Sequence, residues 1–157
     1  MSSEAISSWS HTVPEFQFST EEFYKLVEAK IKERELPEVK VKQRNFKQGG
    51  VFSKNRLYLE VSRKDYIFHI CAAPYGKDYF FSWYLRVKLS FLQEWFSRVP
   101  VIGRFVVRQL QMKTYYQLDT EHMFRQSIHH VVTSCIQDIL EPKGRKLTEL
   151  ERQFRNT

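Results

Sequence analysis

The histidine residues are the first candidates for metal chemistry, and their spacing argues against it. His129 and His130 are adjacent in the sequence, so on a helix their side chains would point about 100° apart. His122 would share a face with His129, but two helical turns would separate them by about 10 Å. The pair Glu121–His122 lacks the second histidine that an HExxH zinc motif requires. We therefore predict no metal site and no cofactor, with these histidines along an exposed helix edge.

A nucleophile beside a base would indicate covalent catalysis, and the nearest such pair is His69 with Cys71. Two residues apart on one strand, they would share a face at about 6–7 Å, which is beyond hydrogen-bond reach. The chain contains no GxGxxG, GxxxxGKS/T or GxSxG motif. Asp65, Asp78 and Asp119 sit where turns and helix caps commonly use aspartate. These observations favour a protein without catalysis, in which His69 is a satisfied core residue.

A small apolar ligand is one alternative partner. Tyr66, His69, Tyr84 and Tyr116 would line a pocket if helices enclosed a cavity against one face of a sheet. Helices packed on a sheet more often enclose only a filled core. The sequence therefore keeps this ligand pocket as an alternative, below a filled core.

Nucleic acid is a second alternative partner. Lys40, Lys42 and Arg44 alternate along one strand pattern, and Tyr58 or Tyr84 would supply stacking platforms near them. Lysines on an edge strand also prevent aggregation, and no RNP, helix-turn-helix or zinc-finger signature is present. We therefore rank nucleic acid below the other partners and expect single-stranded DNA or RNA not to be retained.

Segment 90–111 has the pattern of two short amphipathic helices separated by Pro100. At about 100° per residue, large apolar side chains fall on one arc and arginines on the opposite one. From Arg86 to Lys113 the chain carries six basic residues and one acidic residue. Large apolar side chains opposite arginines suit an interfacial membrane helix, and each arm is too short to span a bilayer. The expected docking residues are Phe91, Leu92, Trp95, Phe96, Arg98, Ile102, Arg104, Phe105 and Arg108.

This segment leads to the main functional prediction, a non-catalytic binding or adaptor module. Its predicted partner is an anionic lipid surface or a partner protein, and a homo-oligomer is a further alternative. The segment would equally serve as core if it covered the free face of the sheet. The predicted location is the cytoplasm, at the periphery of a membrane if segment 90–111 binds lipid.

Composition agrees with a basic, single-domain protein. The chain has 157 residues, a formal net charge of +7 and a pI near 9.4, which suits an anionic partner without choosing one. Cys71 and Cys135 lie among apolar neighbours without a CxxC motif; two reduced thiols are expected, and one disulfide stays open. The first ten residues lack a signal-peptide pattern, and no apolar run is long enough to cross a bilayer.

Hydrophobic periodicity places the elements that would carry these side chains. A helix is predicted over 19–36, with Ser19 and Glu22 as a capping box and Pro37 beyond its end. Period-two alternation predicts strands near 39–44, 57–62 and 79–89, and a run that is apolar on both faces apart from His69 predicts another over 66–73. Short turns between these strands indicate an antiparallel meander. Trp83 is expected to be buried on the sheet between Phe81 and Leu85.

The remaining segments complete an α+β prediction. A fifth strand is predicted over 112–118 and a long helix over 120–140, ended by Pro142 and Gly144. Residues 1–17 are expected to be a flexible arm, ordered only if Trp9 finds a pocket. Residues 18–142 would form one domain, followed by a tail or short helix over 143–157. The predicted fold is a five-stranded, mostly antiparallel sheet with two long helices on one face and the helical hairpin 90–111 inserted.

Overall fold

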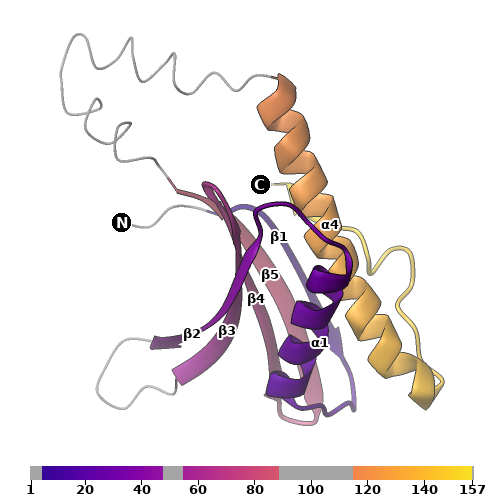
Figure 1. The fold of residues 1–157 in the computed structure, drawn as a ribbon. Helices are drawn as coiled ribbons and strands as arrows, with labels where there is room; N and C mark the ends of the chain where they lie inside the picture. Colours follow the sequence, from indigo (N-terminus) through magenta and orange to yellow (C-terminus); the bar gives the residue numbers. More distant parts are fainter. Residues whose placement is uncertain (1–4, 48–54, 89–114, 157) are drawn as a thin grey trace.

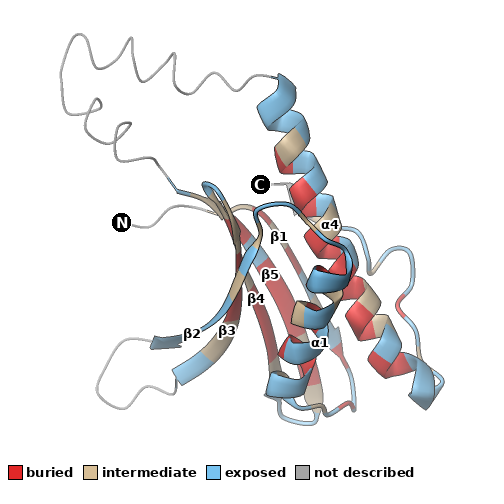
Figure 2. Cartoon of the chain, in the orientation of Figure 1, coloured by how far each residue is buried: buried red, intermediate tan, exposed pale blue. Residues whose placement is uncertain are grey.

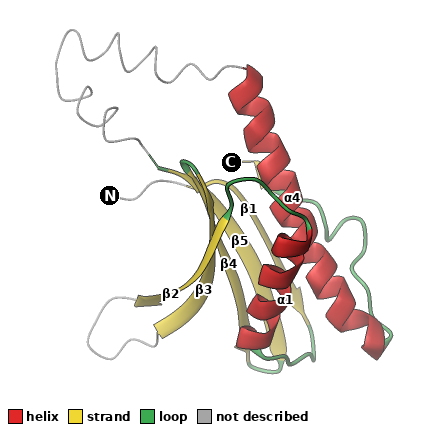
Figure 3. Ribbon diagram, in the orientation of Figure 1, coloured by secondary structure: helices red, strands yellow, loops and turns green. Residues whose placement is uncertain are grey.

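A computed structural model describes residues 5–47, 55–88 and 115–156 of the chain. They form one antiparallel sheet with strand order β2-β3-β4-β5-β1-β6, with helices α1 and α4 on one side (Figures 1 and 3). In chain order the elements are β1 (Ala5–Val13), α1 (Thr20–Glu33), β2 (Lys40–Lys47), β3 (Asn55–Arg63), β4 (Tyr66–Tyr75), β5 (Asp78–Val87), α4 (Tyr115–Leu140), a 3-10 turn (Glu141–Lys143) and β6 (Arg155–Asn156). The predicted α+β class with an antiparallel sheet is confirmed.

The four-strand meander lies where alternation predicted it. Strands β2 to β5 pair as successive antiparallel neighbours, and Gly76 takes the left-handed φ of 62° that the tight turn before β5 requires. The first helix also begins as predicted, because the Ser19 hydroxyl accepts a hydrogen bond from the Glu22 amide at 3.3 Å. It ends at Glu33, three residues earlier than predicted, before Glu35 adopts a left-handed φ of 48°.

The expectation of a flexible arm over 1–17 is wrong for residues 5–13, which form β1 between β5 and β6. Trp9 supplies the reason. Its ring is only 4% exposed, and its Nε1 donates a hydrogen bond to the Glu151 carbonyl at 2.8 Å. The strand was missed in the sequence because Ser7, Ser8 and Ser10 add no apolar residues to the alternation that would indicate a strand.

The predicted fifth strand over 112–118 is also wrong where the structure describes it, because α4 already begins at Tyr115. Tyr116 is 73% exposed, so the alternation there has no buried face to hold a strand. The buried stripe from Phe124 onward packs the 26-residue helix against the core, and each residue added toward the helix N-terminus gains a backbone hydrogen bond. The strand that completes the sheet beside β5 is β1.

The core lies between the sheet and the two helices (Figure 2). Trp83 is fully buried at its centre, and its ring lies 5.2 Å from Phe68, which confirms the predicted burial. Phe68 in turn lies 5.2 Å from Phe124 of α4, while Phe23 of α1 lies 5.0 Å from Phe81. Aromatic pairs in edge-on or tilted geometry such as these add to the stabilisation that comes from burial of apolar area.

Past the 3-10 turn, the chain forms a tail rather than the alternative short helix. The capping-box pair is present but closes a turn: the Thr148 amide donates to the Glu151 carboxylate at 2.7 Å, and the Glu151 amide donates to the Thr148 hydroxyl at 3.3 Å. The chain then pairs as β6 with Ser7 and Ser8 of β1. The predicted hairpin 90–111 lies outside the described residues.

Candidate functional site

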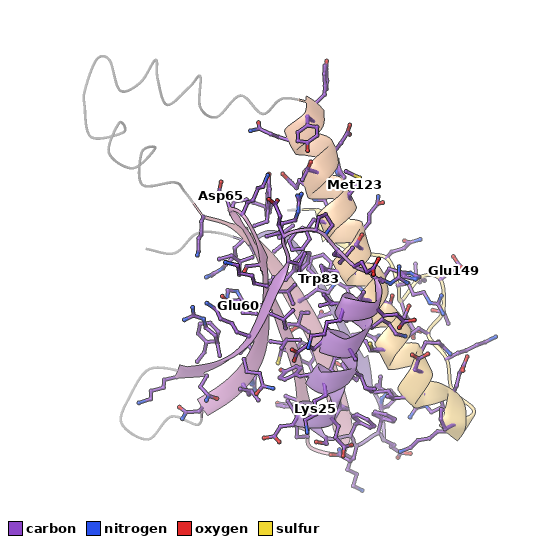
Figure 4. All side chains as sticks on the ribbon, in the orientation of Figure 1. Lys25, Glu60, Asp65, Trp83, Met123 and Glu149 are labelled. Carbon is purple, nitrogen blue, oxygen red and sulfur yellow. The ribbon has the colours of Figure 1, made fainter. Side chains whose placement is uncertain are left out.

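The side of the sheet opposite α1 and α4 gathers most of the polar and aromatic side chains that the sequence singled out. We call it the helix-free face, since both described helices lie on the other side (Figure 3). Strand register builds it in rows across the sheet. The central row runs through Lys42, Glu60, His69, Tyr84 and Ser8. In Figure 4, Glu60 of this row and Trp83 of the core project to opposite sides of the sheet.

Glu60 is the polar centre of this face. It is only 6% exposed, and three basic groups surround its carboxylate: Lys42 Nζ at 3.2 Å, Arg44 Nε at 2.8 Å and His69 Nε2 at 3.5 Å. Burial raises the pKa of Glu60, but the hydrogen bond from Lys42 and the positive charges of Arg44 and Lys42 outweigh burial, so the pKa falls below its usual value. The carboxylate is therefore ionised at neutral pH and holds both cations in place.

His69 sits next to Glu60 in the central row and is half-buried. Burial lowers its pKa, the Glu60 carboxylate opposes that effect, and the charges of Arg86 and Arg44 reinforce it. The imidazole is therefore neutral at neutral pH. Its surroundings are polar, so the expectation of a core histidine is wrong, because odd-numbered residues of β4 face away from the helices.

An aromatic pocket lies beside this pair. It has a volume of about 280 Å³ and is lined by Ala5, Phe46, Tyr58, His69, Tyr84 and Arg86. The Phe46 ring stands 5.2 Å from both Tyr58 and His69, at 89° to each ring. Phe46 is 42% exposed and Tyr84 40% exposed. The ends of β2 and β3 bend away from the helices (Figure 1), and the ring of Phe46 on the edge strand β2 lies beside that of His69.

Positive charge dominates the same face. Among the described strand residues 40–46, 56–62, 67–73 and 80–86 that point to this side, the only acid is Glu60. The cations are Lys40, Lys42, Arg44, Arg56 and Arg86. Because the one acid is buried and paired, the solvent-facing charge of this face is positive.

No protein-family model, curated protein or solved structure matches this chain. The site must therefore be interpreted from its own geometry. That geometry brings together all five residues of the nucleic-acid alternative, Lys40, Lys42, Arg44, Tyr58 and Tyr84. Sequence reasoning missed Phe46, Arg86 and Glu60 as members of the same face. Phe46 could have been found, because it continues the alternation of residues 40, 42 and 44.

The four-residue ligand pocket predicted between sheet and helices is wrong as a set. His69 and Tyr84 line the aromatic pocket, but Tyr66 lies on the helix side, where its hydroxyl donates a hydrogen bond to Glu121 Oε2 at 3.1 Å. Tyr116 is exposed near the start of α4. The positions of Tyr66 and His69 in the sequence already place them on opposite faces of the sheet, since residues three apart on one strand point to opposite sides.

The predicted exposed histidine edge on α4 holds for His122 and His130 but not for His129, which is buried. Trp83 Nε1 donates a hydrogen bond to His129 Nδ1 at 3.0 Å, and His129 Nε2 lies against the Arg152 carbonyl. His129 therefore belongs to the core network. In the sequence, His129 is one histidine within an apolar helical stripe, and that pattern does not predict a hydrogen-bonded histidine in the core.

Three further findings concern the described ranges. No three histidine, cysteine, aspartate or glutamate side chains there lie close enough together to hold a metal ion, and the prediction of no metal site stays a prediction. Cys71 and Cys135 are both free and buried. None of the described helices has the length and apolar character needed to cross a bilayer. The predicted docking residues in segment 90–111 lie outside these ranges.

Proposed function

We propose that this protein is a non-catalytic binding module that takes an anionic partner on its helix-free face. One observation carries the proposal: cations and half-exposed aromatic rings collect on this face, and the single acid among them, Glu60, is buried and neutralised by its neighbours. Such a surface attracts anions over a long range and lets them approach without repulsion. The order of partners predicted from the sequence therefore changes, because strand register brings cations and aromatic rings that are far apart in the sequence onto one sheet face.

The non-catalytic part of the proposal is supported by the chemistry of the face. Burial raises the pKa of the Cys71 thiol, and its hydrogen-bond partners are Tyr58 and Ser82 rather than His69. A thiol with a raised pKa is a poor nucleophile. Glu60 is held ionised by Lys42 and Arg44, so it is not tuned toward the near-neutral pKa of a general acid.

Segment 90–111 remains a second proposed contact, with an anionic membrane or a partner protein. Its apolar arc and its arginines are the sequence features that support it. Sedimentation with anionic and neutral liposomes tests it. Anionic-selective binding that is lost on Arg98→Glu, Arg104→Glu and Arg108→Glu supports a membrane partner, and a folded protein that binds neither liposome contradicts it.

The sheet face is tested by neutralising cations that do not hold Glu60. The triple variant Lys40→Gln, Arg56→Gln and Arg86→Gln leaves Lys42 and Arg44 with their carboxylate. We expect it to lose most of the retention that the natural protein shows on heparin at low salt. The dependence of log affinity on log salt should also flatten, because a complex with fewer cation–anion contacts releases fewer counterions when it forms.

A matched triple variant on the rest of the surface serves as the control. Lys25→Gln, Lys32→Gln and Lys146→Gln remove the same charge from exposed positions away from the strands. Equal losses of retention in both triple variants would show that net charge alone matters. Unchanged retention in the sheet variant would contradict the proposed function.

A further inference from the structure

We propose that the anionic partner is single-stranded nucleic acid, and that the aromatic pocket holds one of its bases. This inference rests on the proposed function and adds the class of partner and the position of one contact. It is carried by an open aromatic pocket on the same sheet face as the cations, with Arg86 in its lining and Lys40 and Arg44 in the rows on either side of His69 and Tyr84.

The size and lining of the pocket suit a flat ring. Its volume of about 280 Å³ lies at the lower end of the range of about 300–1,000 Å³ for small-molecule sites. Phe46 and Tyr84 offer π-faces that are partly open to solvent. Any nucleobase can stack on such faces, because every base has a π-face of its own.

The polar groups beside the rings suit the edge of a base. The His69 imidazole is neutral, and Glu60 next to it is ionised and held by its cations. His69 lines the pocket, and a base carries donors and acceptors on its edge that can hydrogen bond to this imidazole, whereas an alkyl chain offers it no such partner. The pocket is therefore suited to a polar aromatic ring rather than to a lipid tail.

The cations lie where the flanking phosphates of a strand would pass. The row on one side of His69 and Tyr84 contains Lys40 and Arg86, joined across the sheet through Ser62 and Ile67. The row on the other side begins with Arg44, opposite Tyr58. A nucleic-acid strand laid across these rows would place a base in the aromatic pocket. Its flanking phosphates would then lie against Lys40 or Arg86 on one side and against Arg44 on the other.

This arrangement favours nucleic acid over an anionic membrane. A bilayer surface presents phosphate and carboxylate groups in a plane, but it presents no ring that can enter a recess on a sheet. The apolar side chains that an interfacial membrane helix would insert occur instead in segment 90–111. Charge and aromatic complementarity on the helix-free face therefore point to a single strand.

The experiment measures binding of a short oligonucleotide that carries one 2-aminopurine, whose fluorescence falls on stacking, at low salt with the full chain. We expect quenching and a measurable dissociation constant. Phe46→Ala and Tyr84→Ala should each weaken binding by about 5- to 100-fold and reduce quenching, as expected for loss of base–aromatic stacking. Tyr116→Ala removes an exposed aromatic residue from α4 and should leave binding unchanged. Melting temperatures check that each variant is folded.

An oligonucleotide with abasic sites separates the base contact from backbone charge. If it binds as tightly as the normal strand, or if Phe46→Ala and Tyr84→Ala bind normally, the base pocket is wrong while the anionic-partner function stands. The same holds if heparin or phosphatidylserine vesicles bind and no oligonucleotide does, or if a free nucleoside monophosphate binds as tightly as the strand. If heparin, vesicles and oligonucleotides all fail to bind, the proposed function fails with the inference.

Discussion

At the scale of single residues, Glu60 depends on its cations. A buried carboxylate without partners pays its desolvation cost in full. We predict that Lys42→Met with Arg44→Met destabilises the protein by about 1–3 kcal/mol at pH 7, measured by urea unfolding. Lys40→Met removes a cation from the same strand that does not hold Glu60, and it serves as the matched control.

The sign of the pH dependence makes this prediction sharper. In the natural protein the pKa of Glu60 is lowered, so its contribution to stability is present above the unfolded pKa and is lost as pH falls through the folded pKa. In the double variant His69 alone opposes the effect of burial, so the pKa of Glu60 should rise, and stability should instead fall as pH rises through that raised value. A double variant whose deficit is the same at pH 4 and pH 7 would contradict this account.

His129 gives a second residue-scale prediction. Trp83 Nε1 can only donate, so His129 Nδ1 must be the unprotonated acceptor, and Nε2 then donates to the Arg152 carbonyl. Burial lowers the pKa of His129, the contact with the Arg152 carbonyl opposes this, and the charge of His130 adds to the lowering. Protonation would set two N–H donors against each other in the core.

Because the folded pKa of His129 lies below the ordinary histidine pKa of about 6.5, the unfolded chain binds more protons between the two values. The stability that His129 contributes is therefore complete above pH 6.5 and is lost as pH falls through the folded pKa. We expect the free energy of unfolding to decrease between pH 7 and pH 5, and His129→Gln to show a shallower decrease. His130→Gln, at an exposed position next in sequence, should keep most of the slope; an unchanged slope in His129→Gln would contradict the assignment.

At the scale of elements, Trp83 fixes β5 against α4. The side chain is fully buried and contacts Phe68, His129 and Phe154. We predict that Trp83→Ala lowers the free energy of unfolding by about 3–5 kcal/mol, measured by urea unfolding. Tyr84→Ala, at the next position on the opposite face of the strand, should cost less. Equal losses would mean that the two faces of β5 are packed to the same degree.

The elements that could be predicted are those whose side chains carry the sheet or helix period in apolar residues. Residues 66–73 of β4 are apolar on both faces apart from His69, and large side chains alternate in β5, so the meander followed from these patterns. In β1, Ser7 and His11 interrupt the face that carries Trp9 and Val13, so the strand is formed through contacts that are distant in sequence, with β5 and with Glu151. Near Tyr116 the alternation was real, but burial of the later helical stripe decided the local structure.

The candidate site was predictable in its parts and not in its assembly. Lys40, Lys42 and Arg44 were visible as one strand face, but their nearness to His69 and Tyr84 depends on strand register. Register follows from pairing over several strands, which one strand pattern does not specify. The buried state of Glu60 could not be anticipated, because it exists only where Lys42, Arg44 and His69 meet around it.

At the scale of the whole molecule, β1 joins the two ends of the described chain. It pairs with β5 on one side and with β6 on the other. Arg145 Nη1 donates a hydrogen bond to the Pro14 carbonyl at 2.7 Å, and His11 Nε2 lies 3.9 Å from the Glu151 carboxylate. The segment after α4 is therefore held by the first strand, and its order should depend on that strand.

Trp9 is the strongest of these links and the means to test them. Its ring packs edge-on at 5.5 Å from His129, and its Nε1 donates to the Glu151 carbonyl. We expect Trp9→Ala to cost about 3–5 kcal/mol and to speed amide hydrogen exchange in residues 145–153 more than in α1. Ile31→Ala, equally buried at 4% exposure but located on α1, is the control because it should lower global stability without that local effect. If both variants speed exchange in 145–153 equally, relative to their loss of global stability, then β1 does not hold the C-terminal segment and the contacts of Trp9 act only through the core.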